Sequence, residues 1–284
     1  MDALFDRRPP SSLELFVANP LRFLAEHIYR WSCKHRRGII HDNLIRVVCI
    51  SDTHGYHDEI PPLPSGDILI HAGDLTQSGT PQELSKALEW FSEQPHQYKV
   101  YIAGNHDRAL SESDIFATLP SFPNLIYLEE TSATVTINER KLHIYGSPLT
   151  PKHGSWAFQY EREAAEWSAI PLDTNILVTH GPPAHHLDLN GTGCRGLLDA
   201  LWRVRPTLHV FGHIHAARGV ERLDWSDAQA SYDRICSGIG NWKDLVRLLF
   251  GALQRGEHRT VLVNAASLGG FRDEQRRGAI VVDI

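Results

Sequence analysis

The chain has 284 residues, of which 42% are apolar, and a formal net charge of −6 at pH 7. This length and apolar content suffice for one α/β domain with a full core, with or without an extension. A net negative charge gives no attraction to a phosphate polymer, so a nucleic acid partner is not favoured. The four cysteines have no C-x-x-C spacing, which argues against a zinc ribbon or a disulfide framework, and no apolar run is long enough to span a bilayer. We therefore expect a soluble cytoplasmic protein with reduced thiols.

Residues 1–45 are predicted to form an N-terminal helical extension. A pair of serines offers a helix cap, apolar residues then recur at helical spacing, and Pro20 is expected to kink or divide the helix. Between Arg22 and Arg37 the segment carries five basic residues and one acidic residue. Such a basic amphipathic helix is compatible with contact to a membrane surface or to a protein. Packing on the rest of the chain is the favoured interpretation.

Residues 46–284 alternate short apolar runs with helical patterns, as expected of an α/β domain. Buried strands are predicted at 47–50, 68–70, 100–102, 142–145, 176–178, 208–211, 260–264 and 279–284, and helices at 81–94, 111–119, 161–168 and 195–204. The runs at 134–137 and 141–145 are joined by a short polar turn and predict a hairpin. Because a hairpin is antiparallel and β-α-β units are parallel, we expect mixed sheets, compatible with a two-sheet sandwich.

Residues 224–258 interrupt this rhythm and are predicted to be a helical insertion. Their helix is expected at 242–253, with an apolar stripe that consists of Leu245, Val246, Leu248, Leu249, Ala252 and Leu253. Core packing is the favoured interpretation of this stripe, and a lid or a contact face is the alternative.

Five polar signatures directly follow predicted strands. They are Ser51-Asp52-Thr53-His54, Gly73-Asp74, Gly104-Asn105-His106-Asp107, Thr179-His180-Gly181 and Gly212-His213-Ile214-His215. Because the carboxyl ends of strands converge at one edge of an α/β sheet, we expect these side chains to meet in one cleft. The predicted metal ligands are Asp52, His54, Asp74, Asn105, His180, His213 and His215. Each signature alone is more often a cap or a turn, but five in order are specific.

This set of donors suits transition metals. Imidazole binds Mn, Fe, Zn or Ni, while carboxylate and amide oxygens also accept harder ions, so the identity of the metal is not decided. A carboxylate can bridge two divalent ions about 3.5–4 Å apart, and such a pair polarises phosphoryl oxygens and lowers the pKa of a bound water. Asp74 is the candidate for this bridging and catalytic role.

At these five signatures the chain resembles the calcineurin-like metallophosphoesterases, whose ordered pattern is D-x-H, G-D, G-N-H-[DE], H and G-H-x-H. Further runs at 144–148, 156–158, 177–183 and 205–215 resemble the metallophosphoesterase-domain-containing branch, related to the brain and fetal-brain proteins. The resemblance covers residues 46–284. It implies a four-layer α/β/β/α sandwich with mixed β-sheets.

The resemblance also implies a role for each ligand. One divalent metal ion would lie on Asp52, His54 and His215, the second would lie on Asn105, His180 and His213, and Asp74 would be shared. A metal-bridging hydroxide would attack phosphorus in line, and His106 would stabilise or protonate the leaving oxygen. Asp107 either supports this loop or is a structural turn residue.

One position departs from the wider family. Protein serine/threonine phosphatases have G-D-x-V-D-R-G, in which the second Asp supports the catalytic histidine, whereas Gln77 stands at that position here. This departure argues against protein-phosphatase specificity and leaves the orientation of His106 open.

The expected function is hydrolysis of a small phosphodiester of cyclic-nucleotide type. Few cationic side chains accompany the metals, and a diester carries less charge than a monoester. His185 and Arg195 are the predicted substrate contacts. Two alternatives stay open: the same dinuclear site acting on a non-phosphate ester, lactone or carbonyl compound, and a non-catalytic protein-binding scaffold. The oligomeric state is not predicted.

Overall fold

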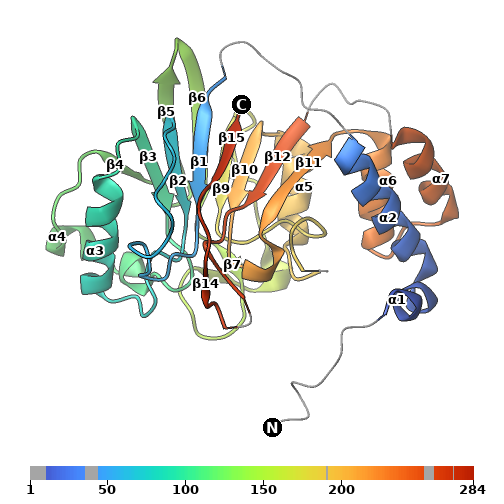
Figure 1. The fold of residues 1–284 in the computed structure, drawn as a ribbon, viewed down its shortest axis with the longest axis horizontal. Helices are drawn as coiled ribbons and strands as arrows, with labels where there is room; N and C mark the ends of the chain where they lie inside the picture. The colour runs from blue at the N-terminus through green and yellow to red at the C-terminus, as the bar shows by residue number, and fades with distance from the viewer. Residues whose placement is uncertain (1–10, 36–43, 190, 253–258, 271) are drawn as a thin grey trace, which may run out of the picture. The chain divides into compact units, whose positions relative to one another are not determined.

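The computed structural model describes residues 11–35, 44–189, 191–252, 259–270 and 272–284 (Figure 1). The chain divides into two units. A helical unit takes Met1–Ile39 and Asp224–His258, and an α/β unit takes Ile40–Leu223 and Arg259–Ile284. No helix in this described part of the chain combines the length and the apolar character of a membrane span.

Two larger β-sheets form the α/β unit. In spatial order, the five-stranded sheet consists of β15 (Ile280–Asp283), β1 (Arg46–Ile50), β2 (Ile68–Ala72), β3 (Tyr98–Ile102) and β4 (Leu125–Tyr127). The six-stranded sheet consists of β11 (Gly219–Asp224), β12 (Arg259–Asn264), β10 (Leu208–Phe211), β9 (Ile176–Thr179), β6 (Arg140–Ser147) and β5 (Thr131–Ile137). Two short pairs are β7 (Thr150–Pro151) with β8 (Gln159–Tyr160), and β13 (Leu268–Gly269) with β14 (Gln275–Arg276).

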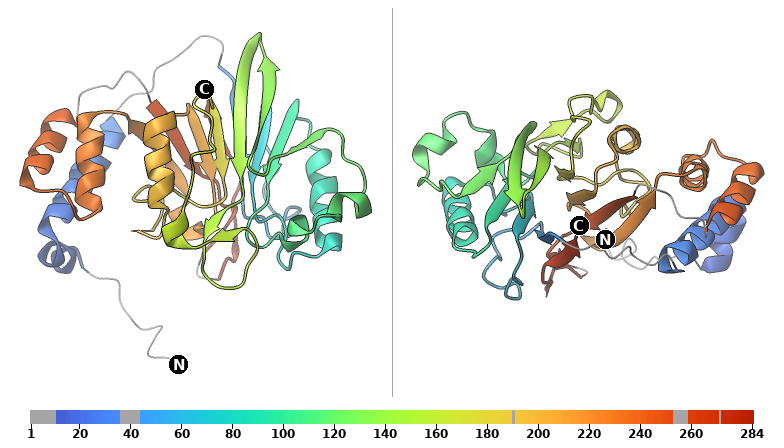
Figure 2. Two further views of the ribbon diagram at one scale, coloured as in Figure 1. Left: turned by 180° about the vertical axis from the view of Figure 1, so that it is seen from behind. Right: turned by 90° about the horizontal axis from the view of Figure 1, so that it is seen from above.

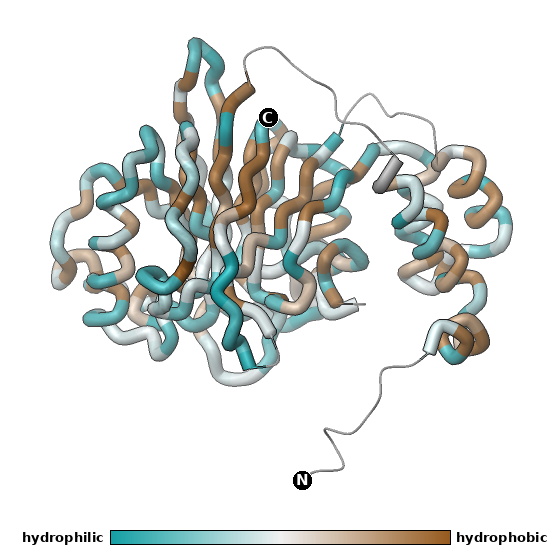
Figure 3. Tube along the Cα trace, viewed as in Figure 1, coloured by the Kyte–Doolittle hydropathy of each residue, from teal (hydrophilic) through white to brown (hydrophobic). Residues whose placement is uncertain are grey.

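Both larger sheets are mixed. In the first sheet β1 to β4 are parallel and β15 is antiparallel to β1. In the second, β12, β10, β9 and β6 are parallel, whereas β5 and β6 form the predicted antiparallel hairpin. Alternate side chains of the two sheets build one buried core between them, to which Val47 and Ile70 contribute from the first sheet and Ile144 and Val178 from the second. Figure 3 shows apolar residues concentrated along these central strands.

Helices cover the outer faces of the two sheets. α3 (Pro81–Ser92) begins at a Thr80 cap with Pro81 in its first turn. Its Leu84 and Phe91 pack against the outer face of the five-stranded sheet. α5 (Arg195–Val204) lies over the six-stranded sheet (Figure 2). This order of helix, sheet, sheet and helix confirms the predicted four-layer α/β/β/α sandwich.

The helical unit contains α1 (Ser12–Ala18), α2 (Pro20–His35), α6 (Asp227–Cys236) and α7 (Trp242–Gly251). Pro20 divides the N-terminal segment as predicted, because α1 ends just before it and the Asn19 side chain accepts the Arg22 N–H at the start of α2. The apolar face of α2 packs on α6 and α7, where Tyr29 stacks on Tyr232 with ring centroids 3.9 Å apart. The N-terminal helices and the helices of the 224–258 insertion therefore share one helical core.

The predicted apolar stripe of α7 divides between two faces of the helix. Leu248 is fully buried in the core of the helical unit, whereas Val246 and Leu249 are 51% and 55% exposed. The interpretation of the whole stripe as core is therefore wrong for those two residues. Leu253, at the end of the stripe, and Arg37, at the end of the basic segment, lie outside the described residues.

Some predicted helices are shorter than expected. The 161–168 segment forms only the 3₁₀ turn η3 (Arg162–Ala164), where the Arg162 guanidinium donates to the carbonyls of Thr192 and Gly193. Within the 111–119 segment only α4 (Ile115–Thr118) is an α-helix, and the 3₁₀ turn η2 (Arg108–Ser111) ends at the first residue of the segment. Short segments of this kind gain little helix stability of their own, so contacts with neighbouring loops decide their conformation.

Candidate metal centre

Five loops at the carboxyl ends of β1, β2, β3, β9 and β10 carry the predicted ligands. Four of these residues adopt the left-handed backbone region: Asp52 (φ 52°), His54 (φ 45°), Asp74 (φ 54°) and His213 (φ 67°). Each such conformation costs a non-glycine residue about 1 kcal/mol or more, and such residues cluster at functional sites. Buried strands immediately before these loops hold the strained turns in place.

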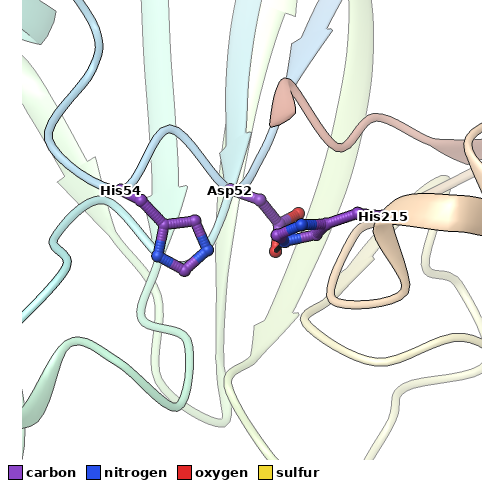
Figure 4. A group of neighbouring side chains, drawn as sticks. All are labelled: Asp52, His54 and His215. Atoms are coloured by element: carbon purple, nitrogen blue, oxygen red, sulfur yellow. Dashed lines mark hydrogen bonds and ion pairs between the residues drawn. The ribbon is translucent and has the colours of Figure 1, made fainter. Parts of the chain in front are cut away.

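The predicted ligands form two clusters whose candidate ligand atoms lie within 4.8 Å of one another, and a third such group, which consists of His54, Asp74 and His106, links them. The first cluster consists of Asp52, His54 and His215 (Figure 4), and the second contains Asp74, His180 and His213. Asn105 joins the second cluster, since its Oδ1 lies 3.1 Å from His180 Nε2. His215 begins the 3₁₀ turn η4 (His215–Ala217), and its Nε2 lies 3.2 Å from Asp52 Oδ1.

Asp74 lies between the two clusters. Its Oδ2 is 3.1 Å from His180 Nε2 on one side and 3.7 Å from His54 Nε2 on the other. Its second oxygen, Oδ1, accepts the backbone N–H of His106 at 2.8 Å. One carboxylate therefore reaches both groups of ligands and the loop of the predicted catalytic histidine.

Glycines allow neighbouring loops to approach the carboxylates closely. A Cβ atom on Gly212 would lie 2.0 Å from Asp52 Oδ2, and one on Gly104 would lie 2.3 Å from Asp74 Oδ1. Only a residue without a side chain fits at either position. The glycines in the G-N-H and G-H-x-H signatures are therefore part of the packing of the site.

Burial opposes ionisation of the two carboxyls, yet hydrogen bonds and opposite charge outweigh it. His215 holds the pKa of Asp52 well below its usual range, and His180 does the same for Asp74. Against the effect of burial, these contacts raise the pKa of His180 and of His215 to about 9. Burial, followed by the charge of His180, lowers the pKa of His213 to about 3. Metal binding would displace protons from His180 and His215, which couples it to pH.

The donor set fits divalent metal ions. His54 is only 6% exposed, and neither of its ring nitrogens has a hydrogen-bond partner among the described residues. Buried polar atoms in proteins are seldom left unpaired, and burial lowers the pKa of His54, which keeps a lone pair available. A metal ion would use that lone pair, and the mixed imidazole and carboxylate donors suit Mn, Fe, Zn or Ni alike.

His106 is oriented by the backbone at the position where protein phosphatases have an acid. Its Nδ1 lies 2.8 Å from the main-chain oxygen of Gln77, so the nitrogen donates and the carbonyl accepts. The ring also stacks on Trp156, with centroids 4.2 Å apart and planes 27° from parallel. The orientation that the sequence left open is therefore provided by a carbonyl oxygen and an aromatic face.

Asp107 joins the loops after β2 and β3. Its buried carboxylate accepts the backbone N–H groups of Gly104, Leu75 and Thr76, and also the Thr76 hydroxyl. Burial first, and then the charge of Asp74, raise the pKa of Asp107 to about 6. The structure thus supports the reading of Asp107 as a residue that fixes these loops.

A cavity of about 580 Å³ opens over the ligands. Besides His106 and five of the ligands (His54, Asp74, Asn105, His213 and His215), it is lined by Tyr56, Gln77, His153, Trp156, Leu268, Arg272, Asp273, Glu274 and Arg276. Leu268 and the lining residues among 272–276 belong to no recognisable motif, so no sequence pattern predicts that they reach the site. Trp156 belongs to a run that resembles the family, but no role was predicted for it.

The two residues predicted to contact substrate do not line this cavity. Arg195 forms an ion pair with Asp199 one turn further along α5, at 3.3 Å. The backbone N–H of His185 donates to Asp188, whose carboxylate also accepts backbone N–H groups in the loop that follows. Substrate contact by His185 and Arg195 therefore remains a prediction.

Comparison with known proteins identifies the class. Residues 45–217 match the calcineurin-like phosphoesterase family, and the chain belongs to it. Fold, family and donor set together define the site of a metal-dependent phosphoesterase. A crystal structure with 15% identity and a TM-score of 0.51, covering 85% of this chain and 95% of the other, has the same fold.

Relatives place the chain in the predicted branch. Metallophosphoesterase domain-containing protein 1 of Homo sapiens is 36% identical over 76% of this chain and 74% of its own length. A UPF0046 protein of Caenorhabditis elegans is 38% identical over 62% and 65% of the two chains. The probable rhamnogalacturonate lyase C of Emericella nidulans is 46% identical over 100% of this chain, which spans 29% of that protein.

Proposed function

We propose that this chain is a metal-dependent phosphodiesterase that acts on a small phosphodiester of cyclic-nucleotide type. The observation that carries the proposal is the position of Asp74, which reaches both ligand clusters and the backbone of His106. One ion would lie on Asp52, His54 and His215, the other on Asn105, His180 and His213, with Asp74 shared. Two divalent ions would polarise phosphoryl oxygens and activate water for attack.

His106 would move the proton that the reaction needs. Because Gln77 accepts the hydrogen on Nδ1, Nε2 is the ring nitrogen available to the cavity, and it would supply a proton to the leaving oxygen. Stacking on Trp156 limits rotation of the ring. The two contacts together hold the proton donor at the rim of the cavity that would receive the substrate.

The rim of the cavity favours a substrate with one negative charge at phosphorus. Arg276 is engaged by Glu59 at 3.0 Å and by the main-chain oxygen of Asp273 at 2.6 Å. Asp273 and Glu274 line the same rim and offset the charge of its arginines. A singly charged diester fits this balance better than a doubly charged monoester, and the half-exposed face of Trp156 suits a planar ring on the substrate.

The test compares substrates with poor and good leaving groups. With Mn²⁺ bound, we expect hydrolysis of cyclic nucleotides and of bis(p-nitrophenyl) phosphate. His106→Ala should reduce the rate of cyclic nucleotide hydrolysis by about 10²- to 10⁴-fold. It should reduce the rate of bis(p-nitrophenyl) phosphate hydrolysis by much less, because p-nitrophenolate leaves without protonation. His143→Ala is the control, since His143 contacts Thr134 on the β5–β6 hairpin. Undiminished turnover of cyclic nucleotides by His106→Ala would contradict the proposal.

Parallel assays address the alternatives. Turnover of p-nitrophenyl acetate or of a lactone, without turnover of any phosphodiester, would indicate a non-phosphate substrate. Absence of all turnover by the metal-loaded protein would favour a protein-binding scaffold. The lyase named for the fungal relative is not part of the proposal, because the chain spans 29% of that protein.

A further inference from the structure

We infer that Asp273 is a positioning residue for His215, and that it strengthens metal binding by the cluster of Asp52, His54 and His215. The inference rests on the metal site of the proposed function. Asp273 lies in the C-terminal part of the chain, outside residues 45–217 that match the family. It is therefore an addition to the ligand pattern of the five signatures.

The two ring nitrogens of His215 have different partners. Nδ1 lies 2.7 Å from Asp273 Oδ1, and Nε2 lies 3.2 Å from Asp52 Oδ1. A carboxylate only accepts, so Nδ1 carries a hydrogen toward Asp273. Nε2 faces Asp52, which is itself a candidate ligand, so Nε2 is the nitrogen that would bind a metal shared with Asp52 once its own proton is displaced. A carboxylate behind a ligand histidine fixes its tautomer and ring orientation and makes the other nitrogen a stronger ligand.

Several contacts hold Asp273 behind the histidine. Its backbone is left-handed (φ 52°), a conformation that Asp tolerates better than most residues. Arg276 donates to the Asp273 main-chain oxygen at 2.6 Å, and its own guanidinium lies 3.9 Å from the centre of the Tyr56 ring. Arg277 donates to the main-chain oxygen of His215 at 3.1 Å. The segment is thus attached both to the loop after β1 and to the backbone of the ligand.

The second cluster is built differently. There, Nδ1 of His180 faces the main-chain oxygen of Ala72 at 2.8 Å. A neutral carbonyl orients the ring but adds less to the basicity of the other nitrogen than a carboxylate does. Loss of the Asp273 carboxylate should therefore lower the affinity for one of the two ions and leave the affinity for the other unchanged.

The experiment is calorimetric titration of the metal-free chain with Mn²⁺ alone and, separately, with Zn²⁺ alone. We expect Asp273→Ala to weaken one of two binding events by about 10- to 100-fold. Asp273→Asn should weaken it less, because an amide oxygen still accepts from Nδ1 and Asn keeps the left-handed backbone. The Asn variant also guards against misfolding of the Ala variant.

The matched control is Glu221→Gln. Glu221 lies 2.6 Å from Nδ1 of the buried His186, so this change alters the same type of carboxylate–imidazole contact away from the ligand clusters. Metal affinity should stay at the wild-type value. Wild-type affinities in both Asp273 variants, or an equal loss in Glu221→Gln, would overturn the inference.

Binding is measured without substrate, which separates this inference from the proposed function. A chain that binds two ions, binds one of them more weakly in Asp273→Ala and hydrolyses nothing would support the inference and refute the phosphodiesterase. A chain that hydrolyses diesters with unchanged metal affinity in both Asp273 variants would do the opposite. The nitrogen chemical shift of His215 Nδ1 gives a second readout, since it should change when the Asp273 carboxylate that accepts the Nδ1–H hydrogen bond is removed.

Discussion

Gly212→Ala should disrupt the site by steric overlap alone. The added Cβ would lie 2.0 Å from Asp52 Oδ2 and 2.1 Å from Ser51 Oγ. To reach an ordinary contact of 3.4 Å, the carboxylate oxygen must move by about 1.4 Å (3.4 minus 2.0). That movement breaks the hydrogen bond that the His213 N–H donates to both Asp52 oxygens at 3.0 Å.

The expected cost combines two effects. Overpacking of a filled site costs about 1–3 kcal/mol, and a buried hydrogen bond to a charged group contributes about 1.5–3 kcal/mol. We therefore expect the free energy of unfolding to fall by about 2.5–6 kcal/mol. Displacement of a ligand by more than 1 Å should also lower phosphodiester turnover by about 100-fold or more.

Gly181→Ala is the matched control for this experiment. Gly181 follows the ligand His180, yet a Cβ there would meet Thr150 Cγ2 at 3.5 Å, an ordinary contact. Urea unfolding and Mn²⁺ titration of both variants measure stability and metal affinity side by side. If Gly212→Ala were as stable and bound Mn²⁺ as tightly as Gly181→Ala, the close packing of the loop on Asp52 would be refuted.

Three further predictions concern residues outside the ligand set. Burial lowers the pKa of His209 to about 3, below its unfolded value of about 6.5. Stability that is present above pH 6.5 should therefore be lost as the pH falls toward 3, by about 1.4 kcal/mol per pH unit. In urea unfolding between pH 6 and 4.5, His209→Gln should reduce the dependence of stability on pH, and an unchanged dependence would contradict this. Asp107→Ala leaves buried N–H groups, including that of Gly104, without their acceptor, and should lower the free energy of unfolding by about 3 kcal/mol or more in the same assay. A decrease of less than about 1 kcal/mol would rule out the role of Asp107 in joining the loops. Tyr29→Ala removes the stack on Tyr232 and should destabilise the helical unit by about 3–5 kcal/mol. Amide hydrogen exchange in α6 should become faster, with exchange in β2 as the internal reference. Equal protection of α6 in the variant and the wild type would argue against the shared core.

The strands, and the order of the polar signatures that follow them, could be predicted from the sequence. Apolar runs such as Ile68–Ala72 end at a Gly-Asp or similar signature, and parallel strands bring their carboxyl ends to one edge. These two rules suffice to expect Asp52 and Asp74 near each other. The assignment of each metal role, however, came from the resemblance to a family and stays a proposal.

Other parts of the site depend on contacts that a sequence does not display. The hydrogen-bond acceptor for His106 is the main-chain oxygen of Gln77, which every residue type has, so the identity of residue 77 does not predict this contact. Asp273 contacts His215 across 58 residues of chain, with no motif of its own to mark it. α6 was missed because it buries polar residues such as Gln229 and Asp233 together with Tyr232, which obscures its helical period.

The shared core of α2, α6 and α7 has an evolutionary consequence. Ala25 and Tyr29 from one segment are buried against Ala228 and Leu248 from the other, so neither segment has a complete apolar core without its counterpart. A lineage that loses the N-terminal helices would expose apolar surface on the insertion, and selection against aggregation should then remove the insertion as well. The two segments, although far apart in the gene, are expected to be inherited and lost as a pair.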